Sequence, residues 1–203
     1  MQASVHSLAS QGNIHALAQF SEELVRCSVD PNTGNICLLD AANGGSVEAV
    51  KYIIALHQAA GTLPAAVDHV GKSGNTALHR ACRWSRHDIA LVLLQAGASP
   101  DIPNDWIQYP LHISVFRQCR GCVKHLLKFN ANIDVVDRKN RRPEGDNRDL
   151  PVPCTADEDL GNLIRAHRQR LGMEVTSVPN YCEGWYGGEI EGVKSVPRQD
   201  RTA

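Results

Sequence analysis

Two cysteines and a histidine that lie close together are the side chains of this chain best placed for chemistry. Cys119 and Cys122 are separated by two residues, and His125 follows within one helical turn. This spacing suits zinc binding or thiol–disulfide exchange. A structural zinc site needs a second ligand pair, however, and none is evident. Cys122 also lies in an apolar helical stripe, at the place that Ile89 takes in the preceding segment. A buried thiol is therefore the favoured interpretation, and metal or redox chemistry is the alternative.

Motifs of other catalytic classes are missing from the sequence. The chain has no GxxxxGK[ST] phosphate loop, no GxGxxG and no GxSxG nucleophile motif. The segment from Gly71 to Gly74 reads GKSG but lacks the upstream glycine of a phosphate loop. Seven cysteines and nine histidines could supply a Cys–His pair, yet nothing in the sequence selects one. We predict that the protein is not an enzyme and uses no cofactor or metal.

The elements that position these residues are clearest between residues 74 and 104. Thr76 stands where a helix needs a side-chain acceptor for its free N–H groups. Apolar residues from Leu78 to Leu94 then follow helical spacing in two stretches separated by a turn. Gly97 ends the second stretch, because the residue after a helix often takes positive φ. This segment is predicted to form two short helices followed by an extended turn.

The same pattern returns in the next segment. Leu111-His112 repeats Leu78-His79, and Pro110 occupies the first helical position, where its missing N–H costs nothing. The two helix openings read TALH and YPLH. The step from position 78 to position 111 gives a period of 33. A period of 33 with a T-P-L-H-like opening is the ankyrin signature, so the chain resembles the ankyrin-repeat family.

The resemblance implies an all-α fold, an ankyrin-repeat solenoid of about four repeats with a C-terminal capping helix. It also implies that His79 and His112 are structural and tie adjacent turns by hydrogen bonds to the backbone. The expected units are the repeats near 1–34, 35–73, 74–106 and 107–140 within a domain spanning 1–150, a capping helix within 151–172 and a tail at 173–203.

The first two repeats depart from the template. Counting one period back from Leu38 reaches Val5, which begins a degenerate copy with three expected core residues: Ile14, Leu17 and Phe20. The step from Leu38 to Leu78 exceeds the period by seven. We expect the excess to lengthen the second helix to a point near Gly61 and to form a loop around Pro64.

The repeat pattern begins a fifth time near the C-terminus but does not continue. Residues 155–158 read TADE, a capping box before a helix. We expect one apolar face on this helix, made by Leu160, Leu163, Ile164, His167 and Leu171. Arg165, Arg168 and Arg170 are expected outside that face, and Gly172 ends the helix. The tail is expected to be flexible, with the alternative that Tyr181, Trp185 and Tyr186 dock on the repeats or on a partner.

In ankyrin proteins the first helices and turn tips line a concave face that binds partner proteins. Solvent-side positions are expected at Asp40, Asn43 and Gly44 in the second repeat, at Arg80, Arg83 and Trp84 in the third, and at Ile113, Phe116 and Arg117 in the fourth. Trp106, Arg138, Lys139 and Arg141 are expected at turn tips. Arginine and tryptophan dominate interface energetics, so the expected partner is an acidic, partly apolar protein segment.

Composition narrows the class of partner. A net charge of −1 and a pI near 6.7 give no general attraction to nucleic acid or membrane. No apolar run is long enough to span a bilayer, and the N-terminal residues do not read as a secretion signal. Scattered cysteines favour an intracellular location, cytoplasmic or nuclear. Binding of nucleic acid or anionic lipid through residues 138–142 remains an alternative, which steep salt dependence would support.

Overall fold

The computed structural model describes residues 4–71, 73–135, 137–138 and 158–172. Within these residues every regular element is a helix, and one isolated bridge joins Val29 to Ile36. This confirms the predicted all-α architecture. None of the described helices is long and apolar enough to cross a membrane.

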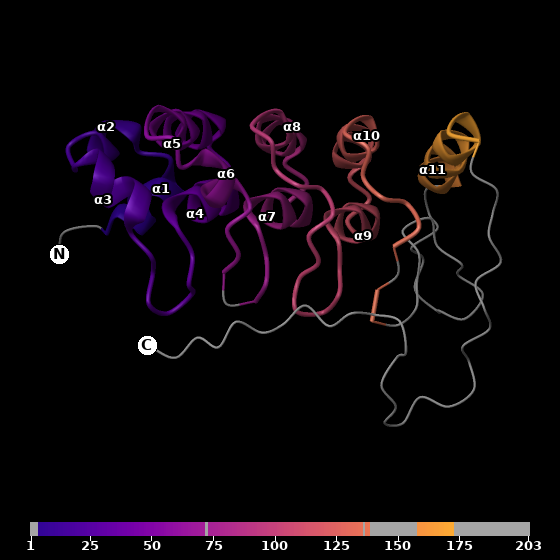
Figure 1. Ribbon diagram of the computed structural model, residues 1–203, viewed down its shortest axis with the longest axis horizontal. Helices are drawn as coiled ribbons and strands as arrows, with labels where there is room; N and C mark the ends of the chain where they lie inside the picture. The colour runs from indigo at the N-terminus through magenta and orange to yellow at the C-terminus, as the bar shows by residue number, and fades with distance from the viewer. Residues whose placement is uncertain (1–3, 72, 136, 139–157, 173–203) are drawn as a thin grey trace, which may run out of the picture.

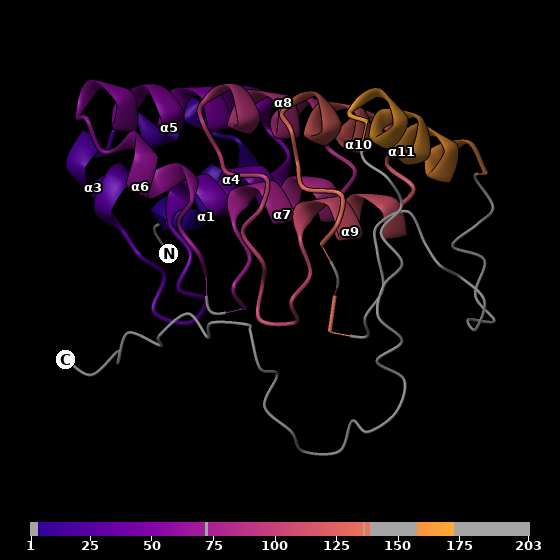
Figure 2. The ribbon, with the colours of Figure 1, turned by 45° about the vertical axis from the view of Figure 1, so that its right-hand side comes forward.

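The helices form two layers. The first helices of the repeats lie side by side in one layer, the second helices and the last helix in the other, and long turns project from the first layer (Figures 1 and 2). The elements are α1 (Val5–Gln11), α2 (Ile14–Leu17), α3 (Glu22–Cys27), α4 (Cys37–Gly44), α5 (Val47–Ala59), α6 (Leu63–Val67), α7 (Ala77–Arg83), α8 (His87–Gln95), α9 (Pro110–Phe116), α10 (Arg120–Lys128) and α11 (Glu158–Arg170).

Helix boundaries follow the caps expected from the sequence. The Thr76 side chain accepts the His79 N–H at the start of α7, and Pro110 is the first residue of α9. Gly97 has a φ of 92° just after α8. Asn130 has a φ of 59° at the equivalent place after α10, where an asparagine tolerates the left-handed region.

Stacking of the repeats buries one continuous core. The first helices contact one another in the order α1, α4, α7 and α9, and α5, α8 and α10 do the same in the second layer. Leu38, Leu78 and Leu111 hold equivalent positions at the starts of their helices and are buried. Leu93 and Leu126 on the second helices are fully buried. Because each helix pair covers its neighbour, the stability of each repeat depends on the repeats beside it.

The histidine of the helix opening ties one repeat to the next. His79 Nδ1 lies 3.2 Å from the Thr76 backbone N–H, and Nε2 lies 3.0 Å from the carbonyl of Gln108 in the following turn. Burial lowers the pKa of His79 to about 4, so the ring is neutral when the array is folded. His112 Nδ1 makes the same local contact with the Tyr109 N–H, at 3.4 Å. This is the structural role that the resemblance implied.

Aspartates at the same position of the second, third and fourth repeats also make contacts with the unit that follows. Asp68 Oδ1 accepts the Ser99 N–H at 2.8 Å, and Asp101 Oδ1 accepts the Asn132 N–H at 2.8 Å. The third aspartate, Asp134, accepts from Arg168 of α11 at 2.6 Å. A side chain of α11 is therefore bound by the last of these three aspartates.

This ion pair corrects the predicted orientation of α11. Arg168 was expected outside the apolar face but is 2% exposed, whereas Leu171 was expected in that face and is 53% exposed. Leu160 and Ile164 are buried, Arg165 and Arg170 are exposed, and Gly172 takes positive φ, as predicted. The carboxylate of Asp134 explains the change, because it offers the buried arginine a charged partner. Residues 155–157 of the expected capping box lie outside the described residues.

Two other local predictions were wrong. The expected loop around Pro64 is the short helix α6, which Pro64 can join because it lies in the first turn. The first repeat contains an additional helix, α3, whose start is capped by the Ser21 hydroxyl. Leu17 is fully buried as expected, while Ile14 and Phe20 are only partly buried. An end unit has a neighbour on one side only, so its stripe is less completely covered.

Candidate protein-binding face

The C-terminal ends of α7 and α9 carry a cluster of arginines and aromatic residues. We call this cluster the basic-aromatic face and define it as Arg80, Arg83, Trp84, Phe116 and Arg117. Trp84 and Arg117 hold equivalent positions on neighbouring first helices, as do Arg83 and Phe116. Trp84 is 53% exposed and Phe116 61% exposed. The structure thus brings five of the predicted binding residues onto two adjacent repeats.

The arginines of this face have no acidic partner in the described chain. No carboxylate of a described residue lies within 4.0 Å of the guanidinium groups of Arg80, Arg83 and Arg117. Arg80 is half-buried, and its buried Nε has no hydrogen-bond partner among the described residues. Burial first, and then the charge of Arg83, lower the pKa of Arg80, while Asp40 opposes them. A bound carboxylate would relieve this repulsion.

Trp84 is oriented by the second repeat. Its indole Nε1 donates to Asn43 Oδ1 at 2.9 Å. Beside it, Arg86 Nη2 lies 3.5 Å from the carbonyl of Asn43, and the guanidinium packs over Gly45. A Cβ at Gly45 would collide with Arg86, and Gly45 also has a φ of 94°. The indole is therefore held in place with much of its ring exposed.

Three predicted solvent-side positions are not available to a partner. Asp40 is bonded to His6 and Asn35, and a Cβ at Gly44 would collide with the backbone of Ser10. Ile113 is only 9% exposed. Each lies where the adjacent repeat covers the helix, and a repeat template does not show how closely neighbouring repeats approach. Of the solvent-side positions predicted in the second repeat, only Asn43 therefore remains available to a partner.

The turn between α8 and α9 ends in an exposed apolar tip. Trp106 is 48% exposed, as predicted, and the next residue, Ile107, is 47% exposed. Ile107 has a φ of 57°, a region that a β-branched residue enters only with strain. The equivalent residues of the two preceding turns are Gly34 and Gly74, both with positive φ. Ile107 was missed from the sequence, although aligning these three turns would have shown an isoleucine where glycine belongs.

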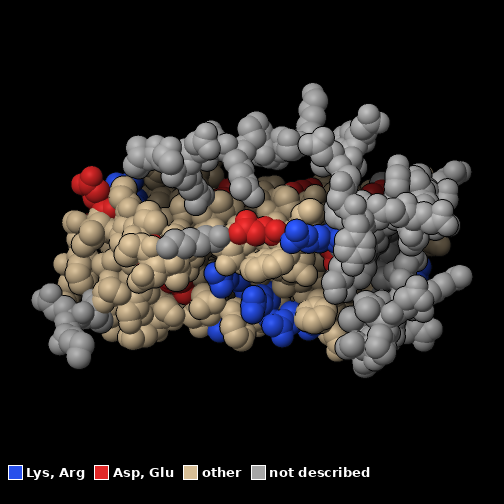
Figure 3. Space-filling model, turned by 90° about the horizontal axis from the view of Figure 1, so that it is seen from below, with Lys and Arg blue, Asp and Glu red and all other residues tan. Residues whose placement is uncertain are grey.

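The predicted basic tip is only partly described. Arg138 is exposed in the turn after α10, whereas Lys139 and Arg141 lie outside the described residues. Viewed from the side of the turns, basic side chains gather over the middle of the array with an acidic spot beside them (Figure 3). Arg138 is thus the described part of the predicted basic tip.

A second basic surface lies between the last repeat and α11. A cleft of about 340 Å³ is lined by Lys124 and Lys128 of α10 and by Arg170 and His167 of α11. Leu127, Leu163 and Ala166 complete its lining, and no carboxylate does so. It has lysines but no exposed aromatic side chain, which distinguishes it from the basic-aromatic face.

The thiols of Cys119 and Cys122 are packed between repeats. Cys119 caps the start of α10, where its Sγ accepts the Cys122 N–H at 3.4 Å. The hydrogen bond with Cys122, followed by burial, raises the pKa of the Cys119 thiol. For Cys122 the bond with Cys119 lowers the pKa, but contact with Cys82 and burial outweigh it. Raised pKa values keep both thiols protonated, which opposes thiolate chemistry. Among the described residues no group of three ligands could hold a metal.

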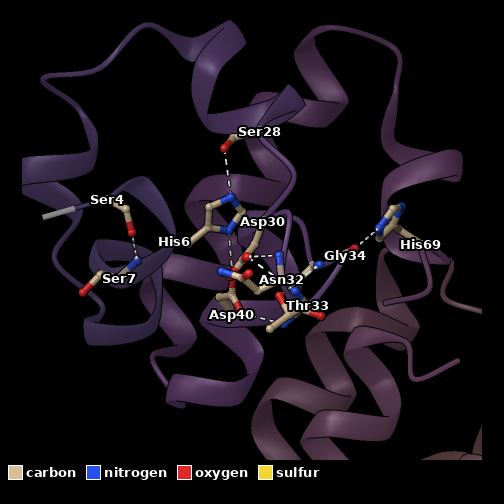
Figure 4. A network of polar contacts seen from close by, with 11 residues as sticks. Ser4, His6, Ser7, Ser28, Asp30, Asn32, Thr33, Gly34, Asp40 and His69 are labelled. Atoms are coloured by element: carbon tan, nitrogen blue, oxygen red, sulfur yellow. Dashed lines mark hydrogen bonds and ion pairs between the residues drawn. The ribbon is translucent and has the colours of Figure 1, made fainter. Parts of the chain in front are cut away.

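A polar network joins the first two repeats (Figure 4). His6 Nδ1 lies 2.7 Å from Asp40 Oδ2, and His6 Nε2 lies 2.9 Å from the hydroxyl of Ser28. Asn35 donates to the other carboxylate oxygen of Asp40 at 2.8 Å. This is the order of a Ser–His–Asp triad, but the Ser28 N–H already donates to the carbonyl of Leu24 at 3.1 Å and is not free to bind an oxyanion. The network instead connects α1, the end of α3 and α4.

Comparisons with known proteins agree with this architecture. A family model described as ankyrin repeats in three copies matches residues 5–104, and a single ankyrin repeat matches residues 108–138. The E3 ubiquitin-protein ligase KEG of Arabidopsis thaliana is 29% identical over 55% of this chain and 6% of the ligase. Human Rabankyrin-5 is 31% identical over 51% of this chain and 10% of its own length. This chain therefore spans only a small part of these relatives.

A solved chain from the complex of the yeast ribosomal protein Rps3 with its chaperone Yar1 has a TM-score of 0.58 and 25% identity. The match covers 61% of this chain and 89% of that chain. Ankyrin repeats are protein–protein interaction modules. Because the repeat matches coincide with helix pairs that stack and recur with the predicted period, the chain belongs to the ankyrin-repeat family.

Proposed function

We propose that this protein is a non-catalytic adaptor or scaffold subunit that binds an acidic, partly apolar segment of a partner protein. The basic-aromatic face receives the segment, and the Trp106–Ile107 tip adds an apolar contact. One observation carries the proposal: three arginines stand beside two exposed aromatic rings, with no carboxylate of a described residue within 4.0 Å of their guanidinium groups.

The chemistry of the face favours carboxylates. A guanidinium binds a carboxylate through two parallel hydrogen bonds, which gives orientation as well as energy. Arg80 and Arg83 repel each other, so a carboxylate between them stabilises both. Arg117 also lies 5.9 Å from the centre of the Phe116 ring, a cation–π contact that presents ring and charge together.

The apolar part of the partner is expected to cover the exposed rings. Aromatic side chains bury a large area at low entropic cost and are frequent at the energetic centre of interfaces. Ile107 supports this use, because a half-exposed isoleucine at positive φ is strained where a glycine would not be. The described cysteines are free thiols, which suits a reducing intracellular compartment.

A defined probe tests the proposal without knowledge of the partner. The probe is a short fluorescent peptide of alternating glutamate, serine and leucine with one tryptophan, and binding is followed by anisotropy. Control probes replace every glutamate by lysine or every apolar residue by serine. We expect the acidic apolar probe to bind and both controls to bind at least tenfold more weakly.

Variants then locate the site. Arg83→Ala with Arg117→Ala should weaken the probe at least tenfold and leave the thermal midpoint unchanged. The matched control, Lys51→Ala with Arg165→Ala, removes two exposed positive charges elsewhere and should leave binding unchanged. Equal affinity of both double variants would contradict the proposed face.

A further inference from the structure

The chain itself contains a segment of the kind that the basic-aromatic face is proposed to bind. Between residues 173 and 193 the sequence has four glutamates and no lysine or arginine. The glutamates are Glu174, Glu183, Glu189 and Glu191, and four large apolar or aromatic residues lie among them: Tyr181, Trp185, Tyr186 and Ile190. We propose that residues 181–191, the acidic tail segment, dock on the basic-aromatic face of the same chain and compete there with the partner. The competition rests on the proposed function.

Charge complementarity favours this site. Three glutamates of the acidic tail segment would meet three arginines that have no carboxylate of a described residue within 4.0 Å. Arg80 is half-buried and is repelled by the charge of the exposed Arg83, so a carboxylate placed between the two guanidinium groups would offset that repulsion. Because both partners belong to one chain, their effective concentration is on the order of millimolar, so weak contacts suffice for docking.

The aromatic residues distinguish this face from the cleft between α10 and α11. That cleft offers Lys124, Lys128 and Arg170 but no exposed ring. On the basic-aromatic face, Trp185 and Tyr186 would find the exposed rings of Trp84 and Phe116. Aromatic pairs add about 0.5–1.5 kcal/mol beyond the area that they bury. The composition of the segment therefore matches the face better than the cleft.

The chain is long enough to make the connection. Trp185 and Glu191 follow Gly172, the last described residue, along the tail. An extended chain reaches at most about 3.6 Å per residue, so the tail can span up to roughly 47 Å from Gly172 to Trp185 and roughly 68 Å to Glu191. From the end of α11 to the basic-aromatic face, the tail must cross two helix spacings of about 8–10 Å along the array. It must also cross from the second layer of helices to the first and pass about 14 Å along a helix. On the order of 40 Å of surface thus separates the end of α11 from the face, within reach of the tail.

Fluorine NMR on the full chain tests the docking directly. The chain has three tryptophans, so 5-fluorotryptophan labelling gives three resonances, which Trp→Phe variants assign. We expect the Trp185 resonance to lie away from its position in the urea-unfolded chain. It should move toward that position in Arg83→Ala with Arg117→Ala and at high salt, which screens exposed charges. Lys51→Ala with Arg165→Ala should not move it.

Three results would overturn the docking. The first is a Trp185 resonance that already lies at its unfolded position in the unmodified chain. The second is a response to Lys124→Ala with Lys128→Ala but not to the arginine variants, which would place the segment in the α10–α11 cleft. The third is a shift that depends on protein concentration, which would assign the contact to a second copy.

Probe binding separates this inference from the proposed function. The variant Glu183→Gln, Glu189→Gln, Glu191→Gln weakens the internal competitor without touching the face. If the segment covers the face two-thirds of the time, the probe should bind this variant about threefold more tightly, because apparent Kd scales inversely with the open fraction. If probe affinity depends on Arg83 and Arg117 but is the same in the tail variant, competition by the tail is refuted and the proposed function stands. If probe affinity is unchanged in the arginine variant, the proposed function is refuted.

Discussion

The N-terminal polar network and the basic-aromatic face use similar groups in opposite ways. Around His6, both ring nitrogens and both carboxylate oxygens of Asp40 have partners from neighbouring elements. On the basic-aromatic face, Arg80, Arg83 and Arg117 have no carboxylate within 4.0 Å in the described chain. A paired cluster stabilises the contact between repeats, whereas an unpaired cluster is left available for another molecule. We therefore expect mutations in the first to change stability and mutations in the second to change binding.

The largest effect should come from the core beneath both regions. Leu93→Ala removes a fully buried side chain of α8 and should lower the free energy of unfolding by about 2–5 kcal/mol, since it leaves a cavity between repeats. Chemical denaturation measures this loss. Val92→Ala, a partly buried neighbour on the same helix, should cost clearly less. Loss of probe binding by Leu93→Ala without loss of stability would contradict the division between core and face.

The buried histidine His79 should make the stability of the array sensitive to acid. Because the pKa of His79 is lowered from 6.5 to about 4 in the folded chain, the unfolded chain binds a proton first as pH falls. The contribution of the neutral His79 ring to the free energy of unfolding is fully present above pH 6.5 and is lost as the pH falls toward 4. The loss amounts to about 3 kcal/mol, since each unit of pKa difference corresponds to 1.36 kcal/mol. Unfolding at a series of pH values should give a shallower slope for His79→Asn. Equal slopes would show that His79 is not buried as a neutral ring.

Disrupting the His6 network should lower the free energy of unfolding by less than a cavity in the core does. His6→Ala removes the partner of both Asp40 and Ser28 and leaves a carboxylate with one contact fewer. We expect a loss of about 1–3 kcal/mol in unfolding free energy and unchanged probe affinity. His15→Ala, at an exposed histidine of the same repeat, should stay within about 0.5 kcal/mol of the parent. If the two variants are equally stable, the network does not join the repeats.

The smallest change in stability should come from the apolar tip, where binding and folding oppose each other. Ile107→Gly removes the strain at φ 57° and should leave stability unchanged or raise it by up to about 1 kcal/mol, while weakening the probe. Gly74→Ala at the equivalent turn is the counterpart. It should destabilise the chain, because its φ is 69° and the new Cβ would collide with Asp105. Tighter probe binding by Ile107→Gly would remove the tip from the site.

Prediction from the sequence succeeded where the repeat template governs local structure. Thr76, Pro110 and Gly97 mark helix boundaries through their own backbone chemistry, so their roles could be assigned without coordinates. It failed for Ile113 and Gly44, whose exposure depends on how closely the adjacent repeat packs. Arg168 failed for a similar reason, because its partner Asp134 lies 34 residues away and follows a different helix.

By itself, the sequence determined the stacked helix pairs, their period and the arginine and aromatic character of the third and fourth repeats, because these depend on local propensity and on a pattern repeated along the chain. Only the tertiary structure decided which charges are paired. Asp40 meets His6, Asp134 meets Arg168, and the arginines at the ends of α7 and α9 meet no carboxylate of the described chain. Pairing depends on distances of a few ångströms between residues far apart in sequence, and periodicity does not encode them.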